Sequence, residues 1–380
     1  MKKQEISQWA ILRNDKWLLS SLTWIPILLA VSIWWIFSQG IAKDLPIGVV
    51  DLQHSSLSRK LIRNFDATSI LKVERSYTDV LSAKKDFVSN HIYGYVVIPK
   101  DFDRGIYLGV PPQVTAFYNS QFILIGKLIN SAILQAHGTF NVQVSSVKQL
   151  AKGNATIQSA VAKSLAIRSQ ITPLFNKNSN YAQFLVSAII PALWQISIVV
   201  STVLLLAANC RIYGFKEITR DKPVKHLISI GMVYLPFFVL QGLAFLFCFY
   251  TFFEWPMFGN YLTIIFIQFI TIIVCMLMGY FFFFLSLDPA RALSLAGAFT
   301  APSFAFMGVT FPVSDMNVLA RTWRSLLPIS HYIEAQIAQV SYGLSGWETI
   351  SKFIPVMSGY IIVFFLVVAL IRKQLSKQVG

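Results

Sequence analysis

Six long apolar stretches without Asp, Glu, Lys or Arg constrain the fold of this chain more than any other feature. A helix needs about 20 apolar residues to cross the hydrocarbon core of a bilayer, and each stretch approaches or exceeds that length. The sequence therefore predicts an α-helical polytopic membrane protein with six transmembrane helices. The stretches cover residues 17–38, 184–208, 227–253, 261–286, 292–312 and 353–371.

The first stretch is separated from the other five by a more polar segment, residues 40–180. Leu45–Asp51 and Ile92–Ile98 have the composition of buried strands, and Gln113–Tyr118 follows a Pro-rich turn. From Gln121 to Leu150, apolar residues recur at helical spacing. We therefore expect an inserted α+β domain with a long helical arm.

The remaining boundaries follow from where the chain is too polar to span. Residues 1–16 place several apolar side chains on one side of a helical wheel, which favours an amphipathic helix on the inner membrane surface, although a frayed basic tail is an alternative. Residues 17–39 form the first expected span, and 181–380 hold the other five. Within that region, residues 312–353 are too polar to span and too apolar for a free loop, so we expect a re-entrant segment.

The net charge of +15 is distributed as membrane topology requires, and it is not a sign of nucleic-acid binding. Lys and Arg precede the first stretch, fill the loop 209–226 and follow the last stretch, whereas the short loop 254–260 has neither. Short basic loops stay in the cytoplasm. The sequence therefore predicts cytoplasmic termini and an external, periplasmic position for residues 40–180.

The sequence lacks the usual motifs of catalysis and metal binding. It contains no GxxxxGK[ST] phosphate loop, no HExxH and no CxxC, so we expect no cofactor or metal in this chain and no ATP hydrolysis by it. Cys210, Cys248 and Cys275 lie outside the inserted domain and are expected to be free apolar thiols. An enzyme acting inside the membrane is disfavoured because no span carries an acid, a base or a metal-ligand set.

Ion-coupled carriers usually need ionisable groups inside the membrane, and these stretches have none. Their polar side chains are amides and hydroxyls, so any transport must draw its energy from elsewhere. We expect a substrate pathway lined by Gln195, Gln241, Gln268, Thr300 and Ser303.

The helical arm of the inserted domain is basic, because no Asp or Glu occurs between Gly105 and Lys216. Unbalanced positive charge beside a membrane attracts anionic ligands or headgroups. The alternative is a helix surface that is merely solvated. The residues concerned are Lys148, Lys152, Lys163 and Arg168.

Several motifs together resemble a known family. Leu45-Pro-Ile-Gly-Val-Val-Asp51, followed by Ser55-Ser-Leu-Ser-Arg59, is similar to the opening of its periplasmic domain, and Tyr93–Phe102 to a later strand of that domain. Phe311-Pro312 and Pro328–Tyr332 resemble the end of its fifth span and the half-inserted helices that follow. On these motifs the chain resembles the bacterial ABC transporter permeases of the type-two exporter family, in the subgroup with a long periplasmic domain between spans one and two.

The resemblance implies a permease subunit in the bacterial inner membrane. Two such chains, identical or related, would form the pathway above a cytoplasmic ATPase dimer that binds ATP and Mg. Members of the subgroup are often paired with a periplasmic membrane-fusion adaptor and an outer-membrane channel. The expected cargo is an amphipathic or lipid-like compound taken from the cytoplasm or the inner membrane. The alternative is a membrane-anchored receptor or scaffold whose external domain binds a partner without transport.

The chain departs from the family in the loop after the second span. There the family carries an acidic Glu-x-Glu-x-Gly-Thr signature that meets the ATPase, whereas this chain keeps the glycine without the preceding acidic pair. The plainer interpretation is an ordinary basic cytoplasmic loop. The resemblance implies ATPase coupling through Tyr213, Gly214, Phe215, Glu217, Arg220 and Asp221.

Overall fold

The computed structural model describes residues 7–40, 42–151, 174–176, 180–215 and 222–379. The chain divides into two compact units. The helical unit comprises Met1–Gly40 and Pro173–Gly380, and the sheet unit comprises Ile41–Thr172. Some residues singled out from the sequence lie outside the described residues: Lys152, Lys163, Arg168, Glu217, Arg220 and Asp221.

Four helical segments of the described chain are long and apolar enough to cross a membrane, by length and composition. They are Tyr181–Tyr213, Pro223–Phe252, Tyr261–Ser286 and Gly346–Ser376. A fifth is obtained if α2 (Lys16–Leu22) and α3 (Trp24–Phe37), which meet at a bend of 41°, count as one span. The helical unit is therefore that of a polytopic membrane protein, whereas six spans stay a prediction.

The predicted span at 292–312 is not one continuous helix. Helix α13 (Pro289–Thr300) has 12 residues, which extend about 18 Å against the roughly 30 Å of a hydrocarbon core. Pro302 has no N–H to continue the helix, and only α14 (Ser303–Phe306) follows. Gly308 then adopts a φ of +84°, a conformation that side chains rarely permit.

The last candidate span begins earlier than the sequence suggested. Helices α17 (Gly346–Ser358) and α18 (Ile361–Val379) together form the segment Gly346–Ser376, so residues 346–353 belong to that segment and not to a separate re-entrant one. Between α14 and α17 the chain forms a short 3₁₀ turn (η2) and two helices. These elements are η2 Val313–Asp315, α15 Val318–Ser325 and α16 Pro328–Val340.

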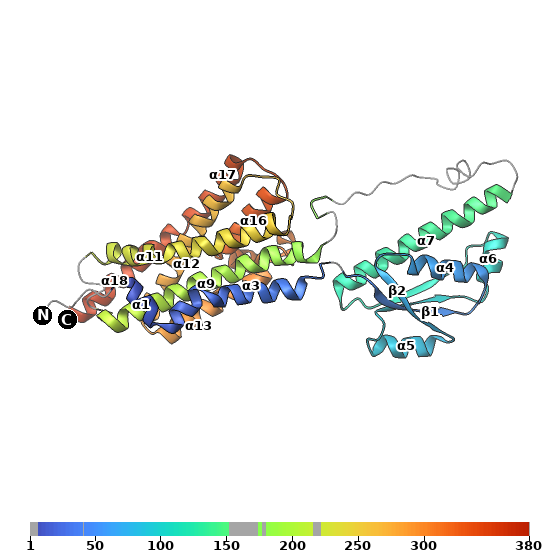
Figure 1. Cartoon of the computed structure of the whole chain (residues 1–380), viewed down its shortest axis with the longest axis horizontal. Helices are drawn as coiled ribbons and strands as arrows, with labels where there is room; N and C mark the ends of the chain where they lie inside the picture. The colour runs from blue at the N-terminus through green and yellow to red at the C-terminus, as the bar shows by residue number, and fades with distance from the viewer. Residues whose placement is uncertain (1–6, 41, 152–173, 177–179, 216–221, 380) are drawn as a thin grey trace. The chain divides into compact units, whose positions relative to one another are not determined.

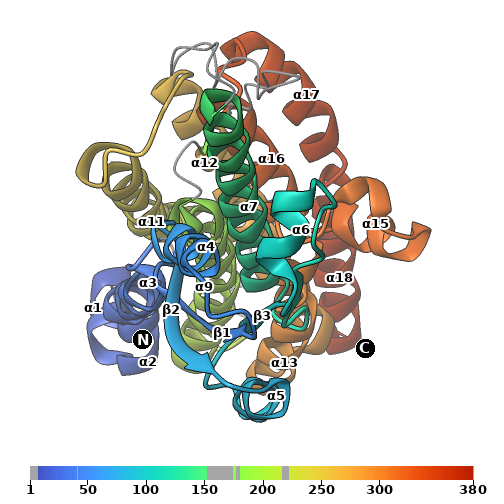
Figure 2. The ribbon, with the colours of Figure 1, turned by 90° about the vertical axis from the view of Figure 1, so that its right-hand side faces the viewer.

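Two long helices lie at the centre of the helical unit. Helix α9 (Tyr181–Tyr213) contacts α2, α3, α11, α12, α13 and α16, and α12 (Tyr261–Ser286) contacts most of the same bundle. Figure 2 shows α3 and α11 (Pro223–Phe247, continued by the π-helical turn η1, Cys248–Phe252) on one side, and α15 and α18 on the other. Ten of the 13 residues of α16 are buried, so this short helix is part of the core.

The sheet unit is built on four strands in the order β2-β1-β3-β4. Strand β1 pairs in parallel with β2 and β3, and β4 is antiparallel to β3. The strand expected over Leu45–Asp51 is β1, with those bounds. The other elements are β2 Leu71–Tyr77, β3 Gly94–Ile98, β4 Thr115–Tyr118, α4 Ser56–Asp66, α5 Val80–Val88, α6 Phe102–Leu108 and α7 Ile123–Ala151.

Helices cover both faces of the sheet. The inner strand β1 alternates its side chains between these two faces. Ile47 and Val49 join the core beneath α4, α6 and α7, whereas Val50 packs with Ala83 of α5. Figure 1 shows α4 and α7 on one face and α5 on the other. Both faces being buried explains why β1 reads as a continuous apolar run.

The Asp-and-Ser motif after β1 fastens that strand to α4. Asp51 is buried; its Oδ1 accepts hydrogen bonds from the N–H groups of Gln53 and His54, each at 3.0 Å, and its Oδ2 accepts one from Ser58 Oγ at 2.7 Å. Ser55 Oγ accepts from the N–H of Ser58 at 2.9 Å, which caps α4. These residues therefore shape the strand-to-helix connection.

Candidate functional site

The last carbonyls of a helix have no donor within it, and one of them, that of Leu22 at the end of α2, lies at the bend between α2 and α3. Pro26 has no N–H to offer to the carbonyl of Leu22, four residues earlier. Gln241 of α11 supplies the missing donor, because its Nε2 lies 2.8 Å from Leu22 O. A neighbouring helix thus satisfies a backbone group that the apolar surroundings would otherwise penalise.

A second proline is compensated in the same way. Pro191 lies inside α9 and has no N–H for the carbonyl of Ser187. Gln336 of α16 donates to Ser187 O at 3.0 Å and is itself buried. This contact attaches the short helix α16 to the central helix α9.

The N-terminus of α16 is also closed by a glutamine. The first N–H groups of a helix have no partner within it, and the N-cap residue Leu327 gives no side-chain hydrogen bond. Gln195 of α9, which is fully buried, accepts from the N–H of Ile329 through Oε1 at 2.9 Å. Two glutamine contacts therefore hold α16 against α9.

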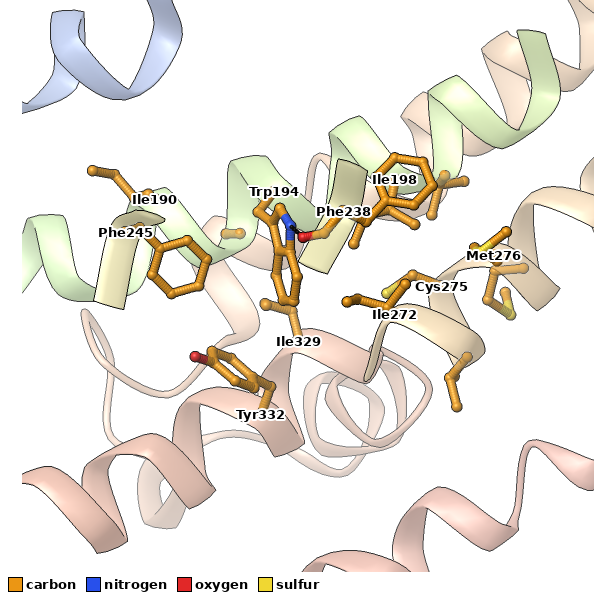
Figure 3. Packing of buried hydrophobic residues seen from close by; sticks show 14 of the residues in the cluster. Ile190, Trp194, Ile198, Phe238, Phe245, Ile272, Cys275, Met276, Ile329 and Tyr332 are labelled. Carbon is orange, nitrogen blue, oxygen red and sulfur yellow. Dashed lines mark hydrogen bonds between the residues drawn. The ribbon is translucent and has the colours of Figure 1, made fainter. Parts of the chain in front are cut away.

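An aromatic cluster joins α9, α11, α12 and α16 beside these contacts (Figure 3). Trp194 donates from Nε1 to Phe238 O at 3.1 Å, and its ring lies 5.9 Å from that of Tyr332. Gln268 of α12 lies within hydrogen-bond distance of the Tyr332 hydroxyl, at 3.2 Å, and donates to Gly242 O at 3.1 Å. A Cβ on Gly242 would lie 2.9 Å from Gln268 and 3.1 Å from Trp194, so glycine permits this close packing.

The structure does not gather the five residues predicted for a substrate pathway around one cavity. Gln195 and Gln268 hold helices together, and Thr300 donates to its own helix at Ala296 O. Ser303 is buried, and its hydroxyl has no hydrogen-bond partner among the described residues. Gln241 lines a cavity.

That cavity lies between α3, α9 and α11 and has a volume of about 240 Å³. Gln241 Nε2 is committed to Leu22 O, which leaves Oε1 as a buried acceptor without a partner among the described residues. The cavity therefore offers a largely apolar surface. Its lining includes Ile27, Ala30, Trp34, Leu193, Trp194, Phe245, Phe249 and Phe253.

The described part of the predicted coupling loop folds against its own unit. Gly214 ends α9 with a φ of +81°, which lets the chain turn. The Phe215 ring meets that of Phe284 edge-on at 6.1 Å, and both Tyr213 and Phe215 pack on a cluster that includes Val367. Part of the Phe215 side chain therefore packs on α12, and only the remaining part can contact a partner.

The N-terminal segment is fastened to the same end of the bundle. Its first described helix, α1 (Gln8–Asn14), is tied by a 2.8 Å hydrogen bond from Gln8 to Asn209 of α9. Asp15 caps α2 and forms an ion pair with Arg211. Within residues 7–16, which the structure describes, the expected helix covers Gln8–Asn14. It packs against α9.

In the sheet unit, one of the predicted basic residues already has a partner. Lys148 donates from Nζ to the carbonyl of Ile106 and borders a cavity of about 450 Å³ between α4, α6 and α7. Burial lowers the pKa of His137, which lines the same cavity. Among the described residues, no three His, Cys, Asp or Glu side chains lie close enough together to hold a metal ion.

Sequence reasoning did not single out Gln336 or Trp194. The signal that could have found Gln336 is Pro191, because a proline within an apolar span implies a donor elsewhere in the fold. The position of that donor, 149 residues beyond the carbonyl it reaches, follows only from the tertiary structure.

We expect Gln336→Leu to destabilise the helical unit by about 1 kcal/mol, because Ser187 O loses its donor. In a Pro191→Ala background the same change should cost less, since the introduced alanine supplies the N–H that the proline lacks. Thermal unfolding of the wild type, the two single variants and the double variant in detergent measures this coupling. Gln241→Leu combined with Pro191→Ala is the control and should be additive. Additive costs for Gln336→Leu and Pro191→Ala would contradict the assignment.

Comparison with known proteins identifies the family. A family model described as an ABC-2 family transporter protein matches residues 16–370. Neither the curated proteins nor the solved structures compared with the chain gave a match. Since the family model spans both units and nearly the whole sequence, the chain belongs to the ABC-2 family of transporter proteins.

Proposed function

We propose that this chain forms the substrate pathway of an ATP-driven exporter for an amphipathic or lipid-like compound. Family membership makes the chain a membrane transport subunit that is not itself catalytic and that works with an ATPase partner. Export and the substrate class are our inference. The observation that carries the substrate class is the apolar cavity beside Gln241.

The cavity suits a ligand that is mostly hydrocarbon. Binding sites for small molecules are typically apolar concavities with a few polar groups that fix orientation. Gln241 is a polar residue of this lining; its Nε2 donates to Leu22 O, and its Oε1 is buried without a partner among the described residues. The surrounding aromatic rings favour hydrocarbon, and a purely hydrophilic solute would gain nothing from them.

The lysine and arginine distribution supports cytoplasmic termini and an external sheet unit in a bacterial inner membrane. On this orientation, the end of the bundle that holds α1, Arg211 and Phe215 faces the ATPase dimer. A second permease chain, identical or related, completes the pathway. A periplasmic adaptor and an outer-membrane channel are further proposed partners, with the basic arm at Lys148 attracting anionic cargo or an acidic adaptor.

We propose that the ATPase is coupled to the permease through the aromatic residues at this end of the bundle. ATPase states can drive a conformational change only through contacts that differ between them. Phe215 touches Phe284 of α12, so a partner that displaces the loop also acts on a central helix. Glu217, Arg220 and Asp221 complete the proposed contact. Helix α16, held by Gln195 and Gln336, is proposed to form the external gate with η2 and α15.

Leu193→Trp tests the substrate site because it places an indole in the cavity. The chain and the ATPase that copurifies with it are reconstituted in vesicles, and ATP-dependent movement of an amphipathic fluorescent dye is measured. We expect Leu193→Trp to reduce this movement several-fold. Leu240→Trp is the matched control, because Leu240 is 67% exposed and does not line the cavity. The proposal fails if no ATPase copurifies, or if ATP drives no movement in the wild type.

Cysteine labelling tests orientation and coupling together, in a chain whose three native cysteines are replaced. An impermeant maleimide added to intact cells from which the outer membrane has been removed should label Arg104→Cys and spare Ile212→Cys. In inverted vesicles the pattern should reverse, and bound ATPase should protect position 212. Labelling of position 212 from outside would contradict the orientation, and unchanged labelling with the ATPase bound would contradict the coupling contact.

A further inference from the structure

Two adjoining hollows lie between α11 and α18, which both pack on α12. The first, of about 470 Å³, is lined at the start of α11 and near the end of α18. The second, of about 220 Å³, continues between α11, α12 and α18. The hollows form one groove because they share four lining residues, namely Val224, Ile228, Val368 and Ile371.

The mouth of the groove is basic. Lys222, Lys225 and Arg372 line the first hollow, and all three side chains are exposed. None of the described residues that line either hollow is Asp or Glu, and none of these three cations forms an ion pair within the described chain. Over the described residues, the mouth therefore carries positive charge without a paired carboxylate, and such charge attracts an anion.

The second hollow is apolar throughout its length. Its walls include Met232, Leu235, Ile273 and Phe364. Tyr280 contributes a hydroxyl, which already donates to Leu227 O at 3.1 Å. This part of the groove therefore favours hydrocarbon and offers a polar ligand no stabilising contact.

We infer that this groove binds an anionic phospholipid, with its headgroup phosphate at Lys222, Lys225 and Arg372 and an acyl chain along α11 and α18. A zwitterionic lipid would match the apolar wall without the charge, and a free phosphate would match the charge without the wall. Basic pockets between membrane helices on the cytoplasmic side bind acidic headgroups in the same way. The site does not depend on the exporter assignment.

Some residues that line the lipid site also pack against the coupling loop. Leu227, Val367 and Ile371 line the groove and also belong to the cluster on which Tyr213 and Phe215 pack. A lipid seated in the groove would therefore add contacts to that cluster. We expect bound lipid to raise the unfolding temperature of the whole chain as well as to be retained by it.

The test titrates the purified full chain in detergent with dioleoylphosphatidylglycerol and, separately, with dioleoylphosphatidylcholine. Retained lipid is counted by native mass spectrometry and the unfolding temperature is recorded. We expect selective retention of phosphatidylglycerol and a rise in unfolding temperature. Replacing Lys222, Lys225 and Arg372 together by Gln should weaken that retention about a hundredfold, given the usual attraction per basic residue near an anionic surface.

Two further variants keep the test decisive. Arg13, Lys16 and Lys373 changed together to Gln remove the same charge from residues that do not line the groove, and retention should persist. Met232→Trp fills the apolar hollow at unchanged charge and should lower retention. Glycerophosphoglycerol, a headgroup without acyl chains, should not bind. Equal retention of phosphatidylcholine, equal loss in both triple variants, or tight binding of the free headgroup would each overturn the proposal.

Discussion

The helical unit depends on one constraint: a backbone polar group inside an apolar bundle must find a partner. The carbonyl of Leu22 lies at the end of α2 and that of Ser187 loses its donor to Pro191, and Gln241 and Gln336 donate to these two carbonyls. Gln195 closes the N-terminus of α16 by the same logic, as an acceptor. Leaving a buried donor or acceptor unpaired costs about 1–3 kcal/mol, which is comparable with the packing of a large side chain.

The same contacts bear on the transport function that we propose. The glutamine contacts attach α16, which is too short to span a membrane, to α9, and α16 also packs on α12. Protein therefore encloses the irregular backbone near the bundle core. Gln241 donates to Leu22 O near the bend between α2 and α3, and it is also a lining residue of the apolar cavity. A substrate bound there would contact α3, α9 and α11, and motion among those helices would alter the site.

The sequence predicted most elements whose pattern is local. Charge-free apolar runs correctly located the candidate spans of α9, α11, α12 and α18, and the run Leu45–Asp51 located β1. It did not show that 292–312 breaks at Thr300, because composition there remains apolar across the break. The roles of Gln195 and Gln268 were also missed, since an amide within a span can line a pathway or satisfy backbone. Which it does depends on partners such as Ile329 that are distant in sequence.

Hydrogen–deuterium exchange of the full chain in lipid nanodiscs tests most directly whether these amides make α16 part of the core. The account predicts that peptides covering Pro328–Val340 exchange as slowly as those from α9 and α12. It also predicts that Gln195→Leu accelerates exchange in that segment while leaving the sheet unit unchanged. Exchange of Pro328–Val340 in the wild type as fast as that of the loop at residues 341–345 would contradict the account.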